Sequence, residues 1–227
     1  MGLHQTTAVI LRRFAYGDSD RIVSFLTPDL GKLKGIAKGA RASQKRFGAA
    51  LEIGTLVRIS FQEGRGELVR IEGAITVAPS DHWRRELTTV TVASVALEWI
   101  DAYVPERGPA TEKFFLLSQF LEKLNPTEAL IQLIAFEKQL LVLSGHAPAW
   151  DYCAECRQTE KKENWRFDPE RGGMLCPHCH GGRGVVAAFD RVQDQEIKLL
   201  QRLLEHHFQV TVGKSLKTSG ALHAVLV

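Results

Sequence analysis

Residues 30–51, LGKLKGIAKGARASQKRFGAAL, carry six positive side chains and no Asp or Glu. The chain has 227 residues and a formal net charge of only +3, so its positive excess is concentrated in this stretch. Because the total charge is small, it is the placement of charge that indicates an anionic partner. The six cations are Lys32, Lys34, Lys38, Arg41, Lys45 and Arg46.

The first part of the stretch has the alternation of a β-strand. Lys32, Lys34 and Lys38 share one face. Leu33 and Ala37 share the other. Such a strand, with ammonium groups in a row, is suited to a polyanion, because neutralised phosphates release their counterions. The alternative is a solvated edge strand whose lysines prevent edge-to-edge pairing.

Residues 39–48 are rich in Gly, Ala, Ser and charge, which predicts a mobile cationic loop after the strand. We predict that the six cations contact nucleic acid and that the loop closes over the strand. Tyr16 and Phe47 are the candidates for stacking a base.

Four further strands are predicted around the basic one, at residues 6–14, 21–26, 54–61 and 68–77, separated by turn residues. Five strands in about 80 residues without a long helix favour a small, partly open barrel. The oligonucleotide/oligosaccharide-binding (OB) fold is the economical candidate, since it binds ligands on a strand face and adjoining loops. Residues 1–79 are therefore predicted to form an OB-fold nucleic-acid-binding domain.

After residue 79 the apolar period changes from two to that of a helix. Helices are predicted at residues 87–104, 111–124 and 127–143, and a last one from near Asp190 to His207. The class is α+β multidomain, with an α-helical domain at 80–227 that carries an insertion at about 150–185. Aromatic residues at core spacing are predicted to pack within these helices, namely Trp99, Phe114, Phe115, Phe120 and Phe136.

The insertion holds all the cysteines, spaced as Cys153-x2-Cys156-x19-Cys176-x2-Cys179. This spacing is typical of a tetrahedral zinc ribbon, with a hairpin predicted at residues 165–175 between two thiolate pairs. Disulfides are the alternative, as is a histidine ligand from His178 or His180. One structural zinc ion is predicted, because four thiolates leave no open position for an activated water.

Catalytic patterns are missing from the sequence. Gly213-Lys214-Ser215 lacks the opening glycine of a phosphate-binding loop, and Asp18 with Asp20 is more simply a turn than a nuclease pair. A binding protein, not an enzyme, is the expectation. The chain has neither a signal-peptide pattern nor a long apolar run, so a cytoplasmic protein is expected. The predicted DNA binding would make it nucleoid-associated.

A set of motifs occurs together in residues 16–23, 31–33, 37–41 and 46–51, and in the C-terminal half in residues 136–141, Gly145, Pro148 and the four cysteines with Gly172-Gly173 before Cys176. Through these residues the chain resembles the bacterial RecO family of recombination mediators. The resemblance implies an OB-fold barrel, a helical domain and a zinc ribbon. It also implies binding of single- and double-stranded DNA, annealing of complementary strands, and RecA loading with RecR on DNA coated by single-strand-binding protein. The acidic tail of that protein is the implied partner of the helical domain.

Different functions remain open from the residues alone. An RNA- or ribosome-associated factor would also combine a barrel with a zinc ribbon. A zinc-dependent nucleic-acid hydrolase would use the cysteine segment for chemistry, and an adaptor would use the basic stretch to hold an acidic protein tail.

Overall fold

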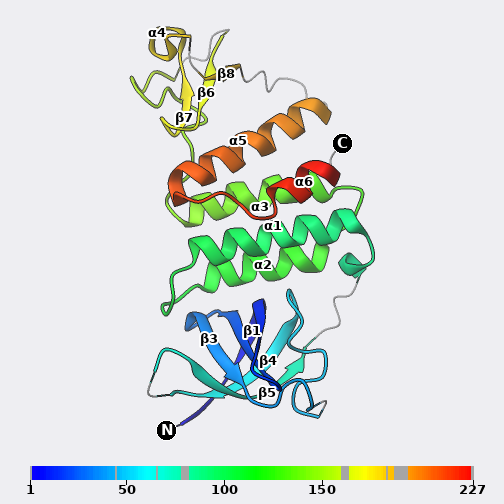
Figure 1. The fold of residues 1–227 in the computed structure, drawn as a ribbon. Coiled ribbons are helices and arrows are strands. Elements are labelled where there is room, and N and C mark those ends of the chain that lie inside the picture. Colours follow the sequence, from blue (N-terminus) through cyan, green and yellow to red (C-terminus); the bar gives the residue numbers. More distant parts are fainter. Residues whose placement is uncertain are drawn as a thin grey trace. The chain divides into compact units, whose positions relative to one another are not determined.

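The computed structural model describes residues 2–43, 45–64, 66–77, 82–159, 164–182, 184–186 and 194–225. It consists of two compact units, residues 1–127 and 128–227 (Figure 1). The elements of the first unit are β1 (Leu3–Tyr16), β2 (Asp20–Thr27), β3 (Gly31–Ala37), β4 (Leu56–Gln62), β5 (Val69–Thr76), η1 (His82–Arg84), α1 (Leu87–Tyr103) and α2 (Thr111–Lys123).

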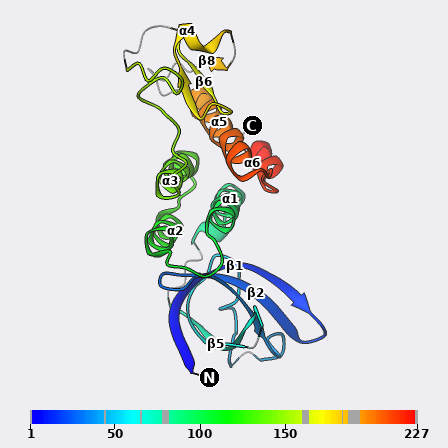
Figure 2. The ribbon, with the colours of Figure 1, turned by 90° about the vertical axis from the view of Figure 1, so that its left-hand side faces the viewer.

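The five strands form a closed barrel (Figure 2). Their order is β1-β2-β3-β5-β4, and β1 also pairs with β4. All the pairs are antiparallel except β3 with β5. The predicted five-stranded OB-fold barrel is confirmed, and it is closed where a partly open one was expected. Its core includes Ile10, Phe25, Ile59 and Phe61, all of them fully or almost fully buried.

A β-bulge in β1 decides which side chains of that strand face outward. The register with β2 shifts between Ile10 and Arg12, so that Ile10 pairs with Phe25 and Arg12 pairs with Ser24. Ile10 and Phe25 belong to the core cluster, and Arg12 and Ser24 do not. Simple alternation would put Ile10 and Arg12 on one face, and the extra residue of the bulge separates them.

The start of β3 lies against the segment that follows α1. The backbone N–H of Arg107 donates to the carbonyl oxygen of Lys32 at 3.1 Å, and that of Gly108 to Leu30 at 3.2 Å. Gly31 has a φ of +66°, and a Cβ there would meet the carbonyl oxygen of Gly108 at 2.0 Å. Only glycine permits this approach, which brings Glu106 beside β3.

Helices α1 and α2 contact each other and the strands β1 and β2. The predicted helices at 87–104 and 111–124 are therefore present with nearly the predicted bounds. Of the aromatic residues predicted to pack, Phe115 differs, since its side chain is 53% exposed. The predicted domain boundary near residue 79 stays a prediction, and residues 78–81 lie outside the described part.

The second unit consists of α3 (Ala129–Leu143), β6 (Arg166–Asp168), β7 (Gly173–Leu175), α4 (Pro177–His180), β8 (Val185–Val186), α5 (Asp194–Val212) and α6 (Ser219–Val225). The order β7-β6-β8 makes a small sheet that includes the predicted hairpin. Helix α5 packs on α3 and runs beyond the predicted end at His207, while Asp190, its predicted start, lies outside the described residues. Within the described residues, no helix is long and apolar enough to cross a membrane.

Candidate nucleic-acid interface and metal centre

The loop between β3 and β4, residues 38–55, packs against the barrel. Ala40, Phe47, Ala50 and Leu51 belong to the same core cluster as the strand residues. This corrects the expectation of a mobile loop, because the small and apolar residues fix the backbone while the charged residues between them stay outside. Phe47 is 2% exposed, so we assign its ring to the core and not to base stacking, which corrects that expectation as well.

Four cations of this loop are exposed, and we call them the loop cations: Lys38, Arg41, Lys45 and Arg46. Among the described residues, no ion pair joins any of them to a carboxylate. The Arg46 guanidinium lies 5.0 Å from the centroid of the Phe47 ring and donates to the carbonyl oxygen of Lys38 at 2.7 Å. These contacts orient the cation without neutralising it.

The first part of the loop, with Arg41, lies next to the β1–β2 turn. The backbone N–H of Arg41 donates to the carbonyl oxygen of Ser19 at 3.0 Å, and its guanidinium donates to that of Asp18 at 2.9 Å. A carboxylate oxygen of Asp20 accepts the N–H of Gly39 at 2.8 Å. Asp20 therefore has a structural role in joining the turn to the loop, as expected from a turn residue.

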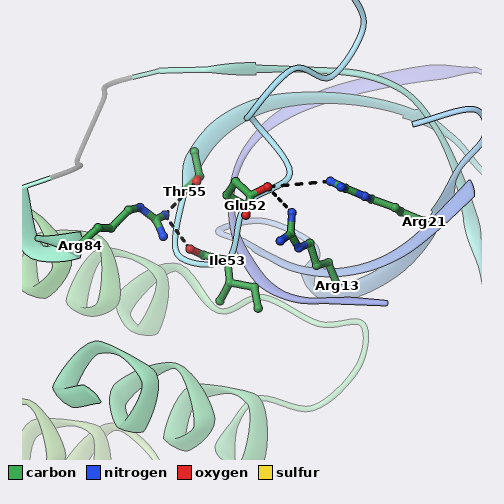
Figure 3. A network of polar contacts seen from close by, with 6 residues as sticks. All are labelled: Arg13, Arg21, Glu52, Ile53, Thr55 and Arg84. Atoms are coloured by element: carbon green, nitrogen blue, oxygen red, sulfur yellow. Dashed lines mark hydrogen bonds and ion pairs between the residues drawn. The ribbon is translucent and has the colours of Figure 1, made fainter. Parts of the chain in front are cut away.

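The far end of the loop is held by a polar network (Figure 3). Glu52 forms ion pairs with Arg13 on β1 and with Arg21 on β2. The Arg84 guanidinium donates to the carbonyl oxygen of Ile53 at 2.6 Å and to the hydroxyl of Thr55 at 3.1 Å. The acidic residue just outside the basic stretch thus anchors the loop to two strands.

The two lysines of β3 are paired with carboxylates, unlike the loop cations. The Lys32 ammonium donates to the carbonyl oxygen of Asp101 at 2.5 Å and lies 3.3 Å from its carboxylate. Lys34 forms an ion pair with Glu106. The hydrogen bond between them raises the pKa of Lys34 and lowers the pKa of Glu106. The six predicted cations are therefore divided into a loop group of four and a strand pair held by acids from α1 and the segment after it.

The outward face of β1 and β2 adds Arg12 and Phe14, which the sequence patterns did not single out, beside Tyr16, which they did. Arg12, Phe14 and Tyr16 follow one another at strand spacing beyond the bulge. Phe14 is 56% exposed and Tyr16 54% exposed. Arg12 forms an ion pair of 2.7 Å with Asp101. Alternation of side chains from Arg12 to Tyr16 could have indicated this face. The predicted strand ended at Phe14, so Tyr16 was not recognised as part of the same face.

The four cysteines lie together in the second unit, with their sulfur atoms all within 4.8 Å of one another. All four are free thiols, so the disulfide alternative is not realised. Two short turns position them, since the N–H of Arg157 donates to the Cys153 carbonyl at 2.9 Å and that of Cys179 to the Cys176 carbonyl at 2.9 Å. His178 and His180 are not part of the cluster.

The cysteine cluster has the donor set of a metal site. Burial acts to raise the pKa of Cys153, but backbone N–H donors of Cys156, Cys176 and Glu155 outweigh it and lower the pKa to about 6. The hydrogen bond with Cys176, together with burial, raises the pKa of Cys179 to about 12. Cys153 thus favours the thiolate form, whereas Cys179 favours the neutral thiol. A bound cation would stabilise the thiolate form of all four cysteines. The residues fit a metal ion.

The fold defines the class of protein: an N-terminal OB-fold barrel followed by helices, with a cysteine cluster in the C-terminal region. The family described as Recombination protein O N terminal matches residues 1–80, and the one described as Recombination protein O C terminal matches residues 84–220. The chain belongs to the RecO family.

Curated relatives agree with this assignment. DNA repair protein RecO of Anaeromyxobacter sp. (strain K) is 36% identical over 200 residues, 83% of this chain and 78% of the relative. The protein of that name from Myxococcus xanthus is 36% identical over 79% of this chain and 73% of its own length. That from Dehalococcoides mccartyi is 31% identical over 88% and 81%. Family membership supports a role in DNA repair and recombination.

Proposed function

We propose that this protein is a DNA-binding recombination mediator that binds single- and double-stranded DNA through the loop cations of its barrel. The observation that carries the proposal is the exposure of Lys38, Arg41, Lys45 and Arg46 without carboxylate partners among the described residues. Unpaired cations on a fixed backbone are available to phosphates without first breaking an internal ion pair. Tyr16, exposed at the adjoining turn, is the candidate for base stacking.

The strand lysines have a smaller part in this proposal. Lys32 and Lys34 add positive potential near the site, but each would have to exchange a carboxylate for a phosphate. Lys32 is the more enclosed of the two, with a side chain that is 11% exposed against 44% for Lys34. We therefore rank Lys34 above Lys32 as a DNA contact.

The test is the salt dependence of binding to single-stranded DNA. If ~4 phosphates are neutralised, the logarithm of the affinity falls with the logarithm of the salt concentration at a slope of about −3. Substituting Lys38→Ala, Arg41→Ala and Lys45→Ala together should reduce the slope to about −1, because about 0.7 is lost per contact. Fluorescence anisotropy at several salt concentrations measures it.

A matched variant controls for net charge. Arg58→Ala, Arg85→Ala and Lys123→Ala remove three cations that are also exposed but lie outside the loop. This variant should keep the wild-type slope. Equal slopes for the loop variant and the wild type would remove the loop from the DNA site.

The mediator activity rests on the family assignment. With RecR, the protein is proposed to assist RecA loading on DNA coated by single-strand-binding protein and to anneal complementary strands in the cytoplasm, at the nucleoid. Annealing requires the screening of two phosphate backbones, which the loop cations would supply. The loop variant used for the salt measurement should therefore also anneal coated complementary strands more slowly than the control variant.

The metal is proposed to be one structural zinc ion held by Cys153, Cys156, Cys176 and Cys179. Four sulfur ligands suit zinc and complete its tetrahedral coordination. The absence of an open ligand position in such a set supports a binding protein over a zinc hydrolase. DNA is favoured over RNA by the family, and competition between DNA and RNA strands of one sequence distinguishes them, since only RNA offers a 2′-hydroxyl.

A further inference from the structure

A pocket of about 290 Å³ lies on the outward face of the barrel, between β1, β2 and β3 and the end of α1. Its volume is at the lower end of the ~300–1,000 Å³ range of small-molecule sites, which suits one ring system with its substituents. The lining residues are Arg12, Phe14, Ile22, Ser24, Lys32, Lys34, Asp101 and Glu106.

A buried hydroxyl in this pocket lacks a partner. Ser24 is 5% exposed, and its oxygen makes no hydrogen bond to any described residue. The strand register places Ser24 between Arg12 on β1 and Lys34 on β3. Buried polar groups are nearly always hydrogen-bonded, so the Ser24 hydroxyl is available to a polar atom that enters the pocket.

The apolar lining of the pocket comes from Phe14 and Ile22. Phe14 pairs with Ile22 across β1 and β2, and Ile22 pairs with Ile36 on β3. Phe14 is more than half exposed, and its ring contacts no other aromatic ring among the described residues. An exposed aromatic ring on an OB-fold strand offers a surface on which a base can stack.

The ion pairs at the pocket differ in their accessibility. Asp101 is shared by Arg12 and Lys32, and its side chain is 18% exposed. The pair of Lys34 with Glu106 is open to solvent, with about half of each side chain exposed. An exposed pair is weak, and a phosphate can therefore replace the Glu106 carboxylate at Lys34. The inner pairs keep the pocket in shape.

We infer that this pocket binds one unpaired nucleotide of a single DNA strand, with the base against Phe14 and Ile22, a polar atom at the Ser24 hydroxyl, and the phosphate at Lys34 in place of Glu106. This inference rests on the proposed DNA binding and specifies which form of DNA fills the pocket. A base in a duplex is stacked on both sides and paired along its edge, so it cannot enter. The pocket thus adds affinity for single strands only.

Phe14→Ala tests the base contact, with Phe115→Ala as the matched control because Phe115 is similarly exposed on α2 of the same unit. Anisotropy titrations compare a single strand, a duplex, and a sugar-phosphate strand of the same length without bases. Phe14→Ala should weaken single-strand binding by a factor on the order of 5 to 150, the measured range for one base stack. It should leave binding of the duplex and of the strand without bases unchanged.

Glu106→Gln tests the phosphate position, because it removes the competing carboxylate and preserves its shape. Single-strand affinity should rise severalfold over the wild type, and the salt slope should become steeper.

Equal losses on single strand and duplex for Phe14→Ala, or unchanged affinity for both Phe14→Ala and Glu106→Gln, would overturn the inference. Either result leaves the proposed function intact, provided that the loop variant used for the salt measurement has a lower affinity for DNA than the wild type. If the variant Lys38→Ala, Arg41→Ala, Lys45→Ala instead binds both single strand and duplex with wild-type affinity, the proposed function is refuted.

Discussion

At the scale of single residues, neighbours in the sequence have opposite roles. Arg46 is exposed and Phe47 is buried, and the guanidinium of the first lies over the ring of the second. The ring is part of the barrel core and also positions a cation of the proposed DNA site. A charged residue next to an aromatic one is therefore not a sign that both meet the ligand.

Substituting Phe47→Ala should lower the free energy of unfolding by about 3–5 kcal/mol, because it leaves a cavity in the core. Tyr16→Ala should change it by less than about 0.5 kcal/mol, since the Tyr16 side chain is exposed. Chemical denaturation of both variants measures the difference. A small effect of Phe47→Ala would mean that the loop is not packed on the barrel in solution.

At the scale of elements, the contact of α3 with α5 contains a buried acid. Glu137 on α3 is fully buried. Burial, and secondarily the charge of Glu205 on α5, raises its pKa well above the ordinary value. The folded chain therefore keeps this proton at a pH where the unfolded chain has released it.

The pH dependence follows from this proton. The stabilising effect of neutral Glu137 is complete below the ordinary carboxyl pKa of the unfolded chain, and it declines as the pH rises towards the folded value. The decline is at most about 1.4 kcal/mol per pH unit, since one proton is involved. Glu137→Gln should remove this contribution and stabilise the protein relative to the wild type at alkaline pH. Chemical denaturation at pH values from about 5 to about 8, which lie above the ordinary carboxyl pKa, measures the difference. If the free energy of unfolding changes with pH in the same way in both proteins, the prediction is contradicted.

A second contact at this scale joins α5 to the cysteine segment. His207 on α5 is buried, and its two ring nitrogens face the carbonyl oxygens of His146 at 2.8 Å and Pro169 at 3.4 Å. The His146 carbonyl lies before the cysteine segment and the Pro169 carbonyl lies in the β6–β7 turn within it, so one side chain joins α5 to both. The helical period of the sequence marks His207 only as the end of a helix.

At the scale of the whole molecule, the loop cations and the cysteine cluster belong to different compact units. Removing the proposed zinc ion with a chelator should therefore disrupt the cysteine segment without changing single-strand affinity. Trp165 is buried beside Cys153 and Cys176, and its fluorescence should shift to longer wavelength. Adding zinc should reverse the shift. A parallel loss of DNA affinity would assign the metal segment to the DNA site.

Local patterns in the chain were sufficient to predict the main strands and helices and the cysteine cluster, while the nucleic-acid contacts stay a prediction. The alternation of β1 to β5 predicted the barrel, the helical period predicted α1, α2 and α3, and the Cys-x2-Cys pairs predicted the cluster. A strand, a helix and a pair of metal-binding cysteines each have a characteristic spacing of residues within a short stretch of sequence. They can therefore be predicted without knowledge of the tertiary structure.

Which cations are free is a matter of tertiary contacts alone. Asp101 and Glu106 lie far along the chain from Lys32 and Lys34, and the close approach at Gly31 brings them together. The bulge that turns Arg12 outward, the packing of Phe47 and the pocket around Ser24 likewise depend on contacts between distant segments. The pairing of a charge is a property of its surroundings in space, and the neighbours that supply it leave no periodic signal in the chain.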